Sequence, residues 1–194
     1  MRTIAIVGNC PQTVDYGAQI DACDEVVRFS HCDGWNGWAG RKTTIWVQRS
    51  DESNRGPRVL HDHKAVLDRV LPNIHTVYVV ADFFNDQRRW VAFSAAKMCR
   101  QYPFLCARVR PLSAKQLTWV CPNNHATNGL VFLHYVLHAN PFPAWSRFLV
   151  GFDFAQYMGS HDAKWEQAIV ERWIEHGHFF RMQPPEQATQ GERA

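Results

Sequence analysis

The sequence predicts an α/β fold with a mainly parallel sheet, and two observations support this prediction. Short apolar runs typical of buried strands alternate with longer segments whose apolar residues recur at helical spacing. The chain has 194 residues, of which 46% are hydrophobic and 20% charged, an ordinary balance for one globular domain. We therefore expect a single Rossmann-like domain over residues 1–182, in which helices flank the sheet. The polar residues 183–194 are expected to be a disordered tail.

Each expected strand is a short cluster of apolar or β-branched residues. The first cluster leads directly into Gly8-Asn9, which is typical of a central strand that ends in a tight turn. Ligands of open parallel sheets bind beyond the carboxyl ends of the strands, so Gly8 and Asn9 are expected at that edge. The stretch alone does not distinguish a ligand-binding turn from a plain one. The seven expected strands are Thr3–Val7, Glu25–Phe29, Thr43–Gln48, Thr76–Ala81, Ala107–Arg110, Arg147–Val150 and His178–Met182.

Four segments between or after these strands have the pattern of amphipathic helices. In the last of them, Trp165, Ala168, Ile169 and Trp173 form one apolar stripe. The four expected helices cover residues 58–71, 85–102, 128–139 and 162–177.

Charge, targeting signals and cysteines exclude several classes of protein. The net charge is +3 and the Lys and Arg residues are scattered, so we expect no nucleic acid partner. No run approaches the roughly 18 apolar residues of a membrane span, and the N-terminus lacks the features of a signal peptide. Peripheral contact of the protein with a membrane surface is not excluded by these features. The six cysteines form no CxxC pair, so we expect reduced thiols in a cytoplasmic protein.

A glycine-rich loop with a basic end is the first segment that could carry chemistry. Residues 34–44 include three glycines and end in "GRKTT", which contains Thr43, and the loop follows Arg28 in the preceding strand. Such a loop could cradle an anion. The pattern is not a Walker motif, and a flexible connection between strands is an equal alternative.

Two helix starts are the next candidates. Thr127-Asn128-Gly129 opens the helix at 128–139, where Thr or Asn would cap the helix and its N–H groups would suit an anion. His161 precedes the helix at 162–177, whose first turn contains Glu166, and an imidazole there could act as a general base. A plain cap at the first helix and a surface histidine at the second are the alternatives.

Two histidine patterns could supply metal ligands. They are His61-Asp62-His63 and the pair His134 and His138, which are one helical turn apart. Neither brings a third ligand from nearby sequence, and the HExxH and Asp-x-Asp patterns are absent. We therefore expect no metal ion and no cofactor.

In this order, the segments resemble the sialyltransferases, the inverting transferases of glycosyltransferase family 29. The family's long motif has its counterpart in "IVGN" at 6–9, "IDACDEVVRFS" at 20–30 and "GRKTT" at 40–44. Its small motif is similar to "HATNGLVFLHYVLHAN" followed by "FLVGFDF" over 125–154, and its very short motif to "HDAKWE" at 161–166. Compact bacterial relatives of this kind carry the label urease operon accessory protein, which describes gene neighbourhood only.

The resemblance implies a variant of the GT-A fold and a metal-independent transfer from a CMP-activated sugar that is sialic-acid-like or Kdo-like. It implies that Gly8, Asn9, Ser30, Thr127, Asn128 and Gly129 bind the donor and its nucleotide. His161 would deprotonate the acceptor hydroxyl of a glycan or glycolipid, and CMP would leave with inversion at the anomeric carbon. Arg28, Thr43 and Glu166 would support the site.

Two departures from the family pattern favour an alternative. Ser30 stands where the long motif has its second asparagine, and the family's third motif has almost no room between Phe152 and His161. The alternative is a catalytically degenerate nucleotide-binding or accessory protein that retains the transferase fold.

Overall fold

The computed structural model describes most of the chain, including seven strands of a central sheet. The described residues are 1–10, 12–30, 38–49, 71–80, 96, 99–100, 102–112, 126–152 and 162–185.

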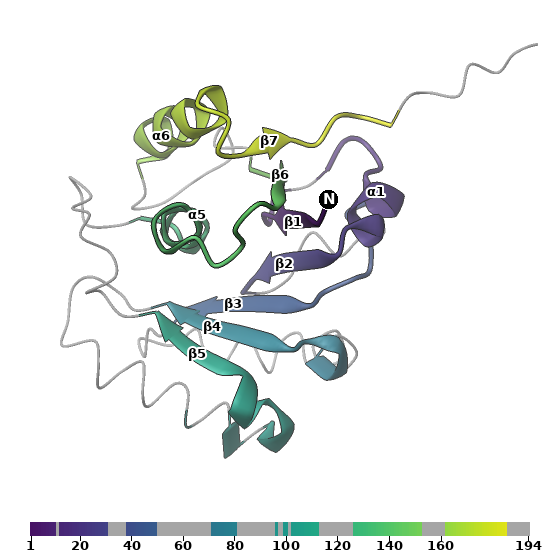
Figure 1. Cartoon of the computed structure of the whole chain (residues 1–194), viewed down its shortest axis with the longest axis vertical. Coiled ribbons are helices and arrows are strands. Elements are labelled where there is room, and N and C mark those ends of the chain that lie inside the picture. The colour runs from purple at the N-terminus through teal and green to yellow at the C-terminus, as the bar shows by residue number, and fades with distance from the viewer. Residues whose placement is uncertain are drawn as a thin grey trace, which may run out of the picture.

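A single parallel sheet of seven strands forms the centre of the molecule (Figure 1). The strand order is β5-β4-β3-β2-β1-β6-β7, and all six recorded strand pairs are parallel. The predicted α/β fold with a mainly parallel, Rossmann-like sheet is therefore confirmed. The strands are β1 (Thr3–Val7), β2 (Glu25–Phe29), β3 (Ile45–Arg49), β4 (Thr76–Val80), β5 (Val109–Leu112), β6 (Ser146–Val150) and β7 (Phe180–Arg181).

The strand order reverses direction between β1 and β6. Strands β1 to β5 follow one another toward one side of the sheet, and β6 then pairs with the other side of β1, in register from Thr3↔Ser146 to Val7↔Val150. In open parallel sheets, ligands bind at such a switch point, beyond the carboxyl ends of the two strands. These ends are followed by Gly8 and Gly151, respectively.

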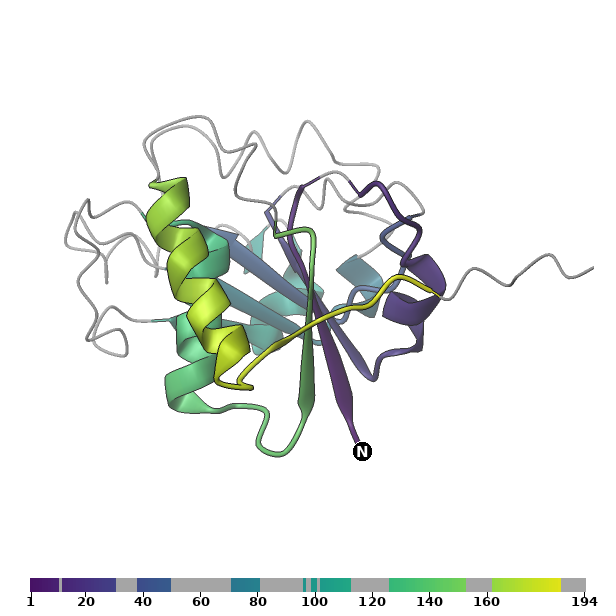
Figure 2. The same ribbon diagram turned by 90° about the horizontal axis from the view of Figure 1, so that it is seen from above.

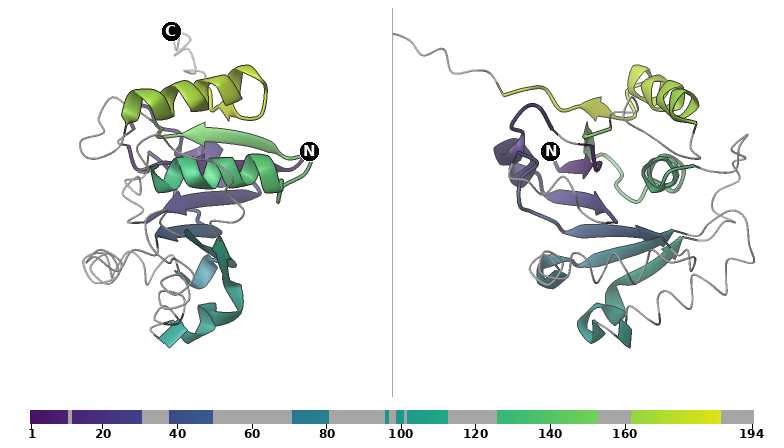
Figure 3. Two further views of the ribbon diagram at one scale, coloured as in Figure 1. Left: turned by 90° about the vertical axis from the view of Figure 1, so that its left-hand side faces the viewer. Right: turned by 180° about the vertical axis from the view of Figure 1, so that it is seen from behind.

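Helices cover both faces of the sheet. Successive residues of a strand point to opposite faces, so they contact different helices. Helices α5 (Asn128–Ala139) and α6 (Ala163–Glu175) pack on one face, over Ile4, Ile6, Val27 and Phe29. Helix α1 (Gly17–Ala22) packs on the other face, over Ala5, Val7 and Val26. Figure 2 shows the sheet between these two helical layers, and Figure 3 shows α5 and α6 lying side by side.

Most predicted elements occur near their expected bounds, and the differences have local causes. Strand β5 begins two residues later than predicted, because Pro103 opens the 3-10 helix η2 (Pro103–Arg108), which takes up Ala107. A second 3-10 helix, η1 (Leu71–Asn73), precedes β4. The helix expected at 58–71 falls almost wholly outside the described residues, as does most of the one at 85–102, of which residues 96, 99 and 100 are helical. Strand β7 is shorter than predicted.

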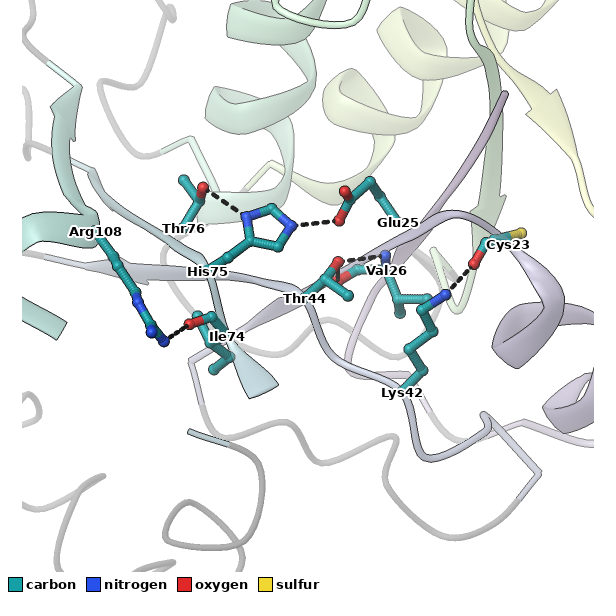
Figure 4. A network of polar contacts seen from close by, with 9 residues as sticks. All are labelled: Cys23, Glu25, Val26, Lys42, Thr44, Ile74, His75, Thr76 and Arg108. Carbon is teal, nitrogen blue, oxygen red and sulfur yellow. Dashed lines mark hydrogen bonds and ion pairs between the residues drawn. The ribbon is translucent and has the colours of Figure 1, made fainter. Parts of the chain in front are cut away.

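Polar contacts tie the strands together at the amino edge of the sheet, where the strands begin (Figure 4). His75 Nε2 lies 2.7 Å from Glu25 Oε2, which links the starts of β4 and β2. Thr44 Oγ1, just before β3, accepts a hydrogen bond of 2.9 Å from Val26 N. Arg108 donates to Ile74 O at 2.6 Å, which joins η2 to the segment before β4. The amino edge is thus held by side chains that bond to one another and to the backbone.

Candidate functional site

The carboxyl edge at the switch point is built on two glycines in close contact. Gly8 N donates to Val150 O at 2.8 Å, and Cys10 N donates to Gly151 O at 3.3 Å. A Cβ atom on Gly8 would lie 2.2 Å from Gly151 O, so a larger residue would force the ends of β1 and β6 apart. Gly8 is therefore required by the packing of the backbone. Asn9, the next residue, is exposed at this edge.

The first turn of α5 lies at the same edge, near the end of β2. Asn128 Nδ2 donates to Ser30 Oγ at 3.2 Å, across 98 residues of sequence. A Cβ atom on Gly129 would lie 2.9 Å from the ring of Phe152, which follows β6. The structure thus brings together five of the predicted donor-binding residues, which are Gly8, Ser30, Thr127, Asn128 and Gly129, and leaves Asn9 exposed beside them.

Thr127 caps α5 as the sequence predicts. Its backbone is extended and its Oγ1 accepts a hydrogen bond of 3.1 Å from Leu130 N. The first backbone hydrogen bond of the helix runs from Val131 N to Thr127 O at 3.0 Å. In the described part of the chain, no partner is recorded for the N–H groups of Asn128 and Gly129. These two donors lie at the positive end of the helix dipole, which is a suitable place for an anion.

Glu166 on α6 is buried and bonds to the start of α5. Thr127 N donates to Glu166 Oε1 at 2.8 Å, and Thr127 Oγ1 donates to Glu166 Oε2 at 2.7 Å. Glu166 as a whole is 1% exposed. Burial raises the pKa of Glu166 from 4.5 to about 7; the bonds from Thr127 oppose this rise and the nearby Asp162 carboxylate adds to it. The site therefore contains a buried acid that titrates near neutral pH.

Ser30 has an unusual backbone conformation. Its φ is 45°, in the left-handed region, where asparagine is favoured over other side chains. Its backbone is held by bonds from Ser30 N to Val47 O and from Trp46 Nε1 to Ser30 O. The position that carries asparagine in the sialyltransferase long motif is thus one whose backbone suits asparagine.

Arg28 and Thr43 lie on the α1 face of the sheet. The Arg28 side chain is buried and donates to Thr43 Oγ1 and Lys42 O, both at 3.1 Å, and to the carbonyls of Ala39 and Gly40. Asp21 accepts from the N–H groups of Arg41 and Lys42. The described end of the glycine-rich loop, residues 38–44, is therefore fastened to the fold by Arg28 and Asp21, and it leads to the amino edge. This role of Asp21 was not predicted from the sequence, since its partners follow about 20 residues later.

Several predicted residues lie outside the described part of the chain. They include His161, residues 34–37 of the glycine-rich loop, and the His61-Asp62-His63 pattern. The residue after His161 is described: Asp162 caps α6 by accepting a bond of 3.0 Å from Trp165 N.

The second histidine pattern, His134 and His138, forms a ring pair whose centroids are 4.1 Å apart. Burial lowers the pKa of His134 to about 4, and the nearby His138 adds to this effect. Within the described ranges, no three His, Cys, Asp or Glu side chains come together to hold a metal ion. No described helix is both long and apolar enough to cross a membrane.

Gly151 and Phe152 complete the switch point, and a sequence pattern could have predicted them. Gly151 follows the last residue of β6 in "VGF" just as Gly8 follows the last residue of β1 in "VGN", so two apolar strands are each followed by glycine. Two such strand–glycine steps in one parallel sheet are a pattern from which adjacent strand ends could be predicted.

The fold and the site define an α/β domain of Rossmann type with polar groups gathered at its switch point. Among solved structures, the chain is similar to one described as the crystal structure of a mammalian sialyltransferase, with a TM-score of 0.53 and 15% sequence identity. The match covers 95% of this chain and 70% of the sialyltransferase chain. At this identity the likeness shows a shared fold. No family model and no curated protein matches the sequence.

Proposed function

We propose that the protein is a glycosyltransferase that binds a CMP-activated sugar at the carboxyl edge of its sheet. The observation that carries the proposal is the convergence of Gly8, Ser30 and the capped start of α5 at the switch point, in a fold shared with a sialyltransferase. The N–H groups of Asn128 and Gly129 would bind the donor phosphate, and Asn9 would contact the nucleotide.

The proposed reaction is a direct displacement at the anomeric carbon. His161 takes the proton of the acceptor hydroxyl, whose oxygen then forms the new bond to the sugar while the bond to the phosphate oxygen breaks. CMP leaves with the electron pair, and the configuration at the anomeric carbon is inverted. The helix N–H groups stabilise the departing phosphate, so the proposed mechanism needs no metal ion.

The assignment of His161 as the base draws support from its neighbours in the chain. His161 directly precedes Asp162, the N-cap of α6, and Glu166 in the first turns of that helix bonds to the N-cap of α5. Helix α6, which His161 precedes in the sequence, therefore contacts the start of α5 through Glu166.

The test is a transfer assay with CMP-sugar donors, combined with CMP binding by calorimetry. His161→Ala should abolish transfer and leave the Kd for CMP nearly unchanged, because a base acts on the acceptor. His176→Ala, an exposed histidine at the far end of α6, is the matched control and should be as active as the wild type. Transfer should also persist in EDTA. Equal loss of CMP binding in His161→Ala would remove the base assignment, and a complete, metal-reversible loss in EDTA would contradict the mechanism.

A second candidate, a nucleotide-binding protein without transferase activity, is favoured by one observation. The amide of Asn128 already bonds to Ser30, which replaces the asparagine of the family pattern. A thermal-shift assay with CMP, UMP and AMP, combined with the transfer assay, distinguishes these candidate functions. Selective stabilisation by CMP without transfer would favour this candidate, and no response to the three nucleotides would favour an accessory protein.

A further inference from the structure

Glu166 shares the start of α5 with the proposed phosphate site. Its Oε1 accepts from Thr127 N and its Oε2 accepts from Thr127 Oγ1, which in turn accepts from Leu130 N. The carboxyl thus uses one N–H group at the helix start and lies next to the Asn128 and Gly129 donors. An ionised carboxylate in this position offsets the positive end of the helix dipole and repels a second anion.

When the carboxyl is protonated, its contact with Thr127 Oγ1 persists with the direction of the hydrogen bond reversed. One oxygen still accepts from Thr127 N, and the new O–H donates to Thr127 Oγ1, which has two lone pairs and also accepts from Leu130 N. Both protonation states are therefore compatible with the contacts between Glu166 and Thr127. What changes is the negative charge beside the two N–H donors.

We infer that binding of the donor phosphate at the start of α5 is coupled to the uptake of a proton by Glu166, so that the site holds its anion more tightly when this carboxyl is neutral. The inference rests on the proposed function, because the anion is the phosphate of the CMP-sugar.

The surroundings of Glu166 favour this coupling. The side chain is 1% exposed, and its pKa of about 7 places the change of charge near neutral pH. Of the described charged groups, Asp162 on the N-cap of α6 acts on it and also favours the neutral form. The titratable side chains of α5, which are His134, Tyr135 and His138, lie about two to three turns further along that helix.

The expected effect is large enough to measure. A phosphate charge within about 8 Å, at an effective dielectric constant of about 20, raises the pKa of the carboxyl by roughly one unit or more. A rise of one unit corresponds to about a tenfold loss of affinity between pH 6 and pH 9. At pH 7.5, about half a proton is taken up for each CMP bound.

The experiment is calorimetric titration of the whole chain with CMP, from pH 6 to pH 9, in two buffers with different enthalpies of ionisation. The variant is Glu166→Gln, which resembles the protonated acid and retains an acceptor for Thr127 N. The control is Glu175→Gln, an exposed glutamate at the end of the same helix. Circular dichroism establishes that each variant is folded, and proton uptake by the wild type needs no variant.

The wild type and Glu175→Gln should take up about half a proton at pH 7.5 and bind CMP about tenfold more weakly at pH 9 than at pH 6. In Glu166→Gln, affinity should stay constant or rise with pH, because the phosphate of CMP gains charge near pH 6. CMP binding with no proton uptake, or the same pH dependence in Glu166→Gln, overturns the coupling and leaves the proposed function intact. Absence of CMP binding by the wild type overturns both.

Discussion

Thr127 is the residue on which the candidate site depends most. It caps α5 through its Oγ1 and donates two hydrogen bonds to Glu166, from its N–H and its hydroxyl. One small side chain therefore fixes the start of one helix and the position of a buried acid on another. Such a shared contact explains why Thr127 and Glu166, 39 residues apart, belong to one site.

The Thr127→Ala variant should lose about 2 kcal/mol of unfolding free energy, because it removes the cap of α5 and leaves one oxygen of Glu166 without its hydroxyl donor. Thr127→Ser keeps the hydroxyl and should lose less than half as much. Urea unfolding at pH 7.5 measures both values. An alanine variant as stable as the serine variant would show that the hydroxyl contacts do not hold the helix start.

At the scale of elements, the contact between the ends of β1 and β6 determines the shape of the carboxyl edge. Gly8 and Gly151 bring the two backbones so close that no side chain fits at Gly8. Gly8 is therefore needed for the close packing of the two strand ends. Asn9, the next residue, lies at the exposed edge. The prediction from the sequence, in which Gly8 forms a tight turn and binds the donor, did not include this packing.

Gly8→Ala should cost about 3 kcal/mol or more, because its Cβ would overlap the carbonyl oxygen of Gly151, 2.2 Å away. Gly177→Ala is the matched control. Its φ is 73° and nothing lies within 4 Å of the added Cβ, so it should cost only about 1 kcal/mol of backbone strain. Chemical unfolding of the two variants gives the comparison, and equal losses would refute the packing role of Gly8.

Strong local patterns explain which elements the sequence predicts well. Strands β1 and β2 and helix α5 have the predicted bounds, because each combines a clear apolar pattern with a turn or cap residue at its end. Strand β5 is displaced, because the 3-10 helix before it has no comparable apolar period. The bonds of Glu166 to Thr127 and of Arg28 to residues 39–43 depend on how distant segments pack, which no local pattern contains.

For the whole molecule, the two edges of the parallel sheet have different roles. The amino edge is held by contacts such as His75 with Glu25 and Arg108 with Ile74. The carboxyl edge carries the switch point, the positive start of α5 and a buried acid with a pKa near 7. This division agrees with the general rule that parallel sheets bind ligands at their carboxyl edge.

A crystal structure of the protein soaked with CMP would show whether the nucleotide binds at the carboxyl edge. Phosphate oxygens should lie within hydrogen-bond distance of the N–H groups of Asn128 and Gly129, with the nucleoside against Asn9. CMP bound at the amino edge or on the α1 face, with the start of α5 left free, would contradict this prediction.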